Sequence, residues 1–214
     1  MSAWWADGVP RRPALSDKLA DWEAFVLVGG QTFLKNRSVL EIGPEFGLDT
    51  LWFSGFAKRW VVLDNAPDVL EWIASLSRMA PGFELMKGDA TKLPFRNGEF
   101  NLVLDFGTFD NTADPFAAYR EACRVLSRHG ILISTYANEI VLGKSDDPHE
   151  TRVHPTRLRE HLEMLDMWVR WQDRHSQPRA VVIAQKYAPQ ADCTWDVDNV
   201  CRCKAATKSL ELRA

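Results

Sequence analysis

Short runs of apolar residues alternate along this chain with segments in which apolar positions recur every three or four residues. A short apolar run bounded by turn residues indicates a buried strand, whereas the longer period indicates a helix that packs on a core. We expect strands at 38–43, 60–63, 83–86, 101–106 and 130–135, with further β-like runs at 167–172 and 180–187. We expect helices at 16–34, 48–58, 67–78, 114–127 and 155–164.

The order of these elements predicts an α/β fold. Strands that alternate with helices form βαβ units, which build a parallel sheet with helices on both faces. The last two β-like runs are separated by a segment containing Ser176, Gln177 and Pro178, which is typical of a hairpin. The sequence therefore predicts a Rossmann-like, doubly wound, mostly parallel seven-stranded sheet that ends in an antiparallel hairpin.

Composition limits the classes of partner. The chain has 214 residues, of which 46% are hydrophobic, and this favours one domain over 1–188 and a polar tail over 189–214. The net charge of −3, without a long basic run, argues against nucleic acid. Apolar stretches are too short for a membrane span. Four cysteines without zinc-ligand spacing or a preceding signal peptide predict reduced thiols, no metal and a cytoplasmic location.

Candidate chemistry gathers where the first expected strand passes into the first expected helix. Segment 41–47 reads E-I-G-P-E-F-G, and Asp64 closes the second expected strand. A glycine turn lets a ligand approach the backbone, and an acidic residue ending the next strand accepts hydrogen bonds from ribose hydroxyls. The turn lacks the G-x-G-x-x-G spacing that binds a pyrophosphate, so an adenosine-type ligand fits better than a dinucleotide.

These residues resemble the class I methyltransferases that use S-adenosylmethionine (SAM), of the type 11 kind, whose first motif reads E/D-x-G-x-G-x-G. The match continues in order through 61–70, 88–95, 100–105 and 121–133. The resemblance implies SAM as cofactor and methyl transfer as activity. It also implies the following cofactor contacts: Glu41, Gly43, Pro44, Glu45, Gly47, Asp64, Asn65, Asp89, Ala90, Asp105 and Phe106.

The resemblance gives several of these residues separate roles. Gly43 and Gly47 would pass beneath the methionine part of SAM, and Asp64 would hold its ribose. Asp89 would accept a hydrogen bond from the adenine amino group. The small side chain of Ala90 would let the adenine ring lie flat beside it.

Two departures from the family pattern affect the expected site. Glu45 stands at the middle glycine of the motif, so either its φ stays negative or the turn stores strain. Its charge could attract the ammonium or sulfonium of SAM, or repel the carboxylate, which leaves a non-catalytic relative as an alternative. Residues 128–130 read R-H-G where the family has P-G-G.

Segment 105–111 follows the fourth expected strand, where the resemblance places residues that face the transferable methyl group. We expect Asp105 or Asp110 to act as a base if the acceptor must lose a proton. An alternative of equal weight for Asp105 is that it caps the next helix or pairs with a structural arginine, and for Asp110 helix capping is the stronger alternative. The segment is similar to the D-K-G-T-x-D of methyltransferases that modify lysines on elongation factors, although Phe106 replaces their Lys.

The acceptor is expected to be a small molecule, because segments 93–95 and 121–130 resemble the subgroup that acts on quinones and other metabolites. A protein lysine is the first alternative. The N-terminal helix 16–34 could cover the cofactor as a lid or pack on the core. His154 is a minor candidate for the acceptor pocket.

Overall fold

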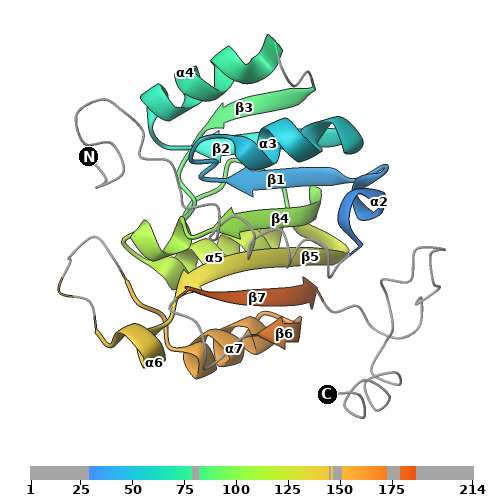
Figure 1. The fold of residues 1–214 in the computed structure, drawn as a ribbon. Coiled ribbons are helices and arrows are strands. Elements are labelled where there is room, and N and C mark those ends of the chain that lie inside the picture. Colours follow the sequence, from blue (N-terminus) through green and yellow to red (C-terminus); the bar gives the residue numbers. More distant parts are fainter. Residues whose placement is uncertain (1–28, 79–81, 145, 147–150, 173–178, 187–214) are drawn as a thin grey trace.

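The structure is a computed structural model that describes residues 29–78, 82–144, 146, 151–172 and 179–186. Within these residues a seven-stranded sheet has the order β3-β2-β1-β4-β5-β7-β6 (Figure 1). The first five strands are parallel, and β7 runs antiparallel to both β5 and β6, which confirms the predicted reversal. The strands are β1 (Ser38–Ile42), β2 (Arg59–Asp64), β3 (Phe83–Lys87), β4 (Phe100–Phe106), β5 (Leu126–Ala137), β6 (Met167–Gln172) and β7 (Arg179–Lys186).

The helices follow the predicted pattern with shifts at their ends. They are α2 (Gly30–Leu34), α3 (Leu48–Phe53), α4 (Pro67–Ser75), α5 (Pro115–Val125), α6 (Glu139–Leu142) and α7 (Pro155–Met164). The expected helix at 48–58 was wrong in its second half, where a 3-10 turn (Ser54–Phe56) contains Gly55, a poor helix former. Of the expected helix 16–34, only α2 lies in the described residues. No described helix has the length and hydrophobicity needed to cross a membrane.

Helices cover both faces of the sheet, as predicted. On one face, Phe33 of α2 and Ile73 of α4 belong to an apolar cluster with Trp60 of β2. On the other face, Tyr119 of α5 and Leu158 of α7 belong to a second cluster of strand residues. All five side chains are buried, and α5 and α7 lie behind the sheet in Figure 1.

The chain between β3 and β4 forms no helix, yet it is part of the core. Ala90, Leu93 and Phe95 are buried in the cluster beneath α5. The Glu121 carboxylate accepts a 2.7 Å hydrogen bond from the Leu93 backbone N–H. Arg124 donates to the Leu93 carbonyl at 3.0 Å and to the Phe95 carbonyl at 2.8 Å. This connection also carries Asp89, so α5 positions a predicted cofactor residue.

We expect Arg124→Met to destabilise the protein by about 1–3 kcal/mol, because two backbone carbonyls lose a donor and Glu121 loses its cation. Urea unfolding measures this free energy. The matched control is Arg159→Met, which breaks an exposed pair with Glu163 on α7 and should cost less than about 1 kcal/mol. An equal loss in the two variants would show that Arg124 does not hold the connection.

Candidate functional site

The site lies at the carboxyl edge of the sheet, where the strand order reverses. From β1 the chain proceeds to β2 and β3 on one side, whereas β4 and β5 lie on the other side. In open α/β sheets, ligands bind outside the carboxyl ends of the strands at such a switch point. The register pairs Ile42 of β1 with Asp105 of β4, so the two predicted segments, 41–47 and 105–111, meet there.

The turn after β1 has a left-handed backbone at three residues. The φ angles are 66° at Gly43, 49° at Glu45 and 74° at Gly47. Of the two alternatives predicted for Glu45, a negative φ or a strained turn, the structure has the strained turn. The positive φ costs about 1 kcal/mol for a residue with a Cβ. A 2.7 Å hydrogen bond from the Gly47 N–H to the Pro44 carbonyl closes the turn.

Both glycines of the turn are also required by the surrounding chain. A Cβ on Gly43 would overlap the side chain of Thr108, and a Cβ on Gly47 would lie 2.5 Å from Cδ1 of Ile73. The Thr108 hydroxyl donates to the Ile42 carbonyl at 3.1 Å. The absence of side chains at 43 and 47 thus permits close packing of α4 and of the segment after β4 around the turn.

Glu41 lies beneath the turn and is only 2% exposed. Its Oε2 accepts hydrogen bonds from the Thr50 hydroxyl at 2.5 Å and from the Trp60 indole N–H at 2.7 Å. These bonds tie β1 to α3 and β2. Glu41 therefore positions the turn, and its predicted contact with the cofactor stays a prediction.

Asp64 and Asp89 stand at the ends of the next two strands along the edge. Oδ1 of Asp64 accepts the Ala66 N–H at 2.8 Å, and burial raises the pKa of this carboxyl. Oδ1 of Asp89 accepts both the N–H and the hydroxyl of Thr91 at 2.8 Å. Asn65 is exposed beside Asp64. Each carboxylate is thus oriented by its own turn through Oδ1.

Asp105 is fully buried at the end of β4. Its Oδ1 accepts the backbone N–H groups of Thr108 at 2.8 Å and Phe109 at 3.2 Å, and its Oδ2 accepts the Ser134 hydroxyl at 2.6 Å. Burial, opposed by these hydrogen bonds, raises the pKa of Asp105 to about 6. The geometry favours the capping interpretation over the predicted role as a base.

Asp110 is also buried, at 3% exposure. Its Oδ2 accepts the Ala137 backbone N–H at 2.6 Å, and its own carbonyl accepts the Thr151 N–H at 2.7 Å. It therefore joins the segment after β4 to the end of β5. Asn111 donates to the Gly107 carbonyl at 2.8 Å, which closes the same segment on itself.

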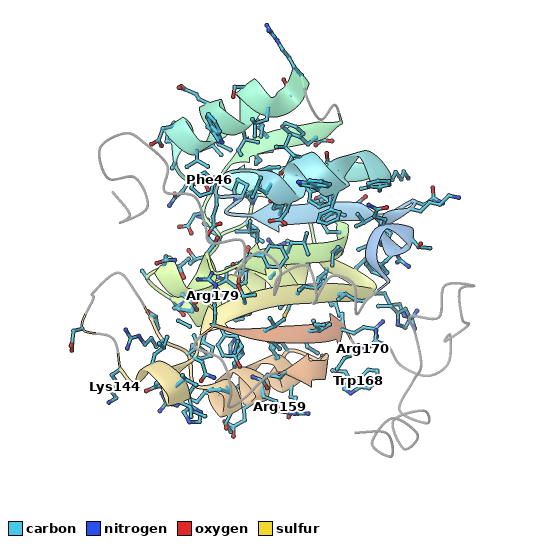
Figure 2. The ribbon with its side chains drawn as sticks, viewed as in Figure 1. Phe46, Lys144, Arg159, Trp168, Arg170 and Arg179 are labelled. Atoms are coloured by element: carbon cyan, nitrogen blue, oxygen red, sulfur yellow. The ribbon has the colours of Figure 1, made fainter. Side chains whose placement is uncertain are left out.

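Arg179 was not among the predicted site residues, and the fold brings it to this edge. Its Nη2 donates to the carbonyl of Phe106 at 2.7 Å, although the two residues are 73 positions apart. Figure 2 labels Arg179 and Phe46 along the same side of the sheet. No local motif marks Arg179, because only the antiparallel direction of β7 places it here. His154, in contrast, caps α7 through a 3.3 Å bond to the Thr156 N–H.

The residues at this edge fit SAM. Asp64 is half-buried and Asp89 is exposed at the ends of β2 and β3, so both offer carboxylates to hydroxyl and amino donors of a ligand. Among the described residues, no group of His, Cys, Asp or Glu could hold a metal ion. Cys123 is buried in the core, where burial raises its thiol pKa to about 12, and the other cysteines lie outside the described residues.

Known proteins resemble this chain in sequence and in fold. Residues 40–134 match the family model of the type 11 methyltransferase domain. A 2-methyl-6-phytyl-1,4-hydroquinone methyltransferase from Oryza sativa subsp. japonica is 31% identical over 104 residues, which cover 46% of this chain and 29% of the rice protein. The match thus spans less than a third of that relative.

Solved structures share the fold. The [4+2]-cyclase SpnF superposes with a TM-score of 0.69 at 16% identity, over 86% of this chain and 85% of its own. A SAM-dependent methyltransferase from Mesorhizobium loti has a TM-score of 0.66 at 13% identity, over 78% of this chain and 97% of its own. The fold is therefore that of the class I SAM-dependent methyltransferases. The residues that match the type 11 methyltransferase model, 40–134, lie within this fold, and the methyl donor of that family is SAM.

We expect Asp105→Asn to change how stability depends on pH. The pKa of Asp105 is raised from 3.8 to about 6 by folding, so its contribution is fully present below pH 3.8 and is lost as pH rises through about 6. The amide oxygen can keep the two backbone N–H bonds and the amide NH2 can donate to the Ser134 hydroxyl in place of accepting from it, but the amide has no such ionisation. The unfolding free energy of the variant relative to the native protein should therefore rise between pH 4 and 7, by up to about 3 kcal/mol.

Urea unfolding at several pH values measures this difference, with Asp68→Asn on the exposed part of α4 as the control. The control difference should change much less over the same range, because Asp68 is exposed. A flat difference for Asp105→Asn would mean that Asp105 is ionised equally easily in the folded and unfolded chain.

Proposed function

We propose that this protein transfers the methyl group of SAM to a small-molecule acceptor. The observation that carries the proposal is the strained turn 43–47 at the switch point, flanked by Asp64 and Asp89 at the ends of the next two strands. All of these residues lie within the family match. The name of the rice relative, a hydroquinone methyltransferase, supports a small aromatic acceptor.

In this proposal the donor lies along the carboxyl edge of the sheet. Asp64 holds the ribose, Asn65 borders the ribose or the adenine, and Asp89 and Ala90 hold the adenine. The turn 43–47 carries the methionine part, as the family resemblance implies. The acceptor then lies past the end of β4, because the adenosine half occupies the side of β2 and β3.

The protein contributes to the reaction mainly by positioning the donor and the acceptor. When bound, SAM supplies a methyl group that its sulfonium already activates. The carboxylates of Asp105 and Asp110 are buried and hydrogen-bonded within the chain, so they shape the segment that faces the methyl group. Holding the acceptor in line, away from water, supplies the acceleration. The proposed role of Asp105 or Asp110 as a base would require either carboxylate to leave these partners.

We expect Asp64→Asn to weaken SAM binding about tenfold, because a neutral amide accepts hydrogen bonds from ribose hydroxyls less strongly than a carboxylate does. The amide oxygen can still accept the Ala66 N–H, so the turn should persist. Isothermal titration calorimetry measures the affinity. Asp68→Asn, four residues away on α4, is the charge-matched control and should bind within about twofold of the native protein. Native protein that binds no SAM would end the proposal.

A labelling experiment tests the class of acceptor. The protein is incubated with methyl-tritiated SAM and with cell extract separated into small-molecule and macromolecular fractions. We expect label in the small-molecule fraction. Label in protein alone would favour the lysine acceptor suggested by segment 105–110, and no label in either fraction, with SAM bound, would favour the non-catalytic alternative suggested by Glu45.

A further inference from the structure

Arg179 occupies an unusual place for an exposed arginine. It is the first residue of β7, and the register pairs it with Ala137, the last residue of β5. Because β7 is antiparallel, its first residue lies at the same edge as the last residues of the parallel strands. The side chain reaches past β5 to the end of β4, where Nη2 donates to the Phe106 carbonyl at 2.7 Å (Figure 2).

The backbone after β4 leaves room for this guanidinium. A Cβ on Gly107 would overlap Nη2 of Arg179, and Gly107 has a φ of 91°, which a side chain would make unfavourable. The glycine therefore serves the close approach of the arginine. Anchored by one hydrogen bond and packed over the backbone, the guanidinium is held at this position before any ligand arrives.

Within the described residues, no carboxylate pairs with this charge. Asp105 is near enough for Arg179 to lower its pKa, but Asp105 is buried and already accepts hydrogen bonds from Thr108, Phe109 and Ser134. A guanidinium has five N–H donors, and one of them is used here, by Phe106. Because the Arg179 side chain is exposed, its remaining N–H donors are accessible to a ligand.

The order of strands places Arg179 on the acceptor side of the site. Asp89 and Asp64 follow β3 and β2 on one side of the switch point. Arg179 reaches the end of β4 from the other side, across β5. In the proposed function the adenosine half of SAM lies at β2 and β3, so this guanidinium borders the space beyond the methyl group.

We infer that Arg179 binds an oxyanion group of the methyl acceptor, a carboxylate or a phosphate, so that the acceptor is an acidic small molecule. The inference rests on the proposed function. The planar fork of an arginine matches the two oxygens of such a group and fixes its orientation as well as its position. An anion held beside Gly107 would orient the rest of the acceptor toward the turn at Gly43.

The first measurement tests whether Arg179 binds the methyl donor rather than the acceptor. This test is needed because SAM itself carries a carboxylate. SAM affinity is measured by calorimetry for the native protein, Arg179→Met and Arg78→Met. Arg78 is an exposed arginine after α4, at the opposite edge of the sheet. We expect all three to bind SAM within about twofold of one another. A loss of about tenfold or more in Arg179→Met alone would assign Arg179 to the donor and overturn the inference.

The second measurement uses three probes in the presence of S-adenosylhomocysteine: benzoate, phenyl phosphate and the uncharged benzamide. The readout is the NMR signal of the side-chain Nε–H that disappears in Arg179→Met. We expect benzoate or phenyl phosphate to shift this signal saturably, and benzamide to leave it unchanged. The probe that binds more tightly identifies the oxyanion. Arg179→Met should weaken its binding about 10- to 100-fold, and Arg179→Lys less, because the ammonium keeps the charge without the fork.

Other outcomes would overturn the inference. These are no saturable shift with either anion, an equal shift with benzamide, or anion binding that Arg179→Met leaves unchanged. The native protein's affinity for SAM is read in the first measurement, independently of the probes. Failure to bind SAM would therefore count against the proposed function, whereas SAM binding without anion binding would count against Arg179 alone.

Discussion

The contact between the end of β4 and the turn after β1 is the constraint on which the site depends. Asp105 accepts the Thr108 N–H, and the Thr108 hydroxyl in turn donates to the carbonyl of Ile42. The threonine side chain then occupies the space that a Cβ on Gly43 would need. One buried carboxylate therefore determines where the backbone of the turn can lie, and hence the shape of the edge offered to a ligand.

The same carboxylate connects this edge to the helix layer behind the sheet. Ser134 donates to Asp105, and the hydroxyls of Ser134 and Tyr119 are 2.9 Å apart. Tyr119 is fully buried, and burial raises its pKa well above the ordinary value. Because the hydroxyls of Tyr119 and Ser134 both have hydrogen-bond partners in this series, the buried carboxyl group of Asp105 can be kept in a largely apolar core. A rigid edge of the sheet suits a reaction that depends on how donor and acceptor are positioned.

Much of the site was visible in the sequence, because its residues follow predicted strands directly. The turn 43–47, Asp64 and Asp89 each stand where a strand ends, and parallel strands bring their ends to one edge. The role of Asp105 was not visible in the same way. Whether a carboxylate at a strand end faces solvent or the core depends on the helix packed over it, and that information is not local.

The sequence by itself determined the order of strands and helices, the reversal at the final hairpin and the position of the glycine turn. These features follow from periodicity and turn residues, which act over a few neighbours. Only the tertiary structure decided the left-handed φ of Glu45, the burial of Asp105 and the arrival of Arg179 beside Gly107. Each of these depends on contacts between segments distant in the chain, which no short pattern of residues encodes.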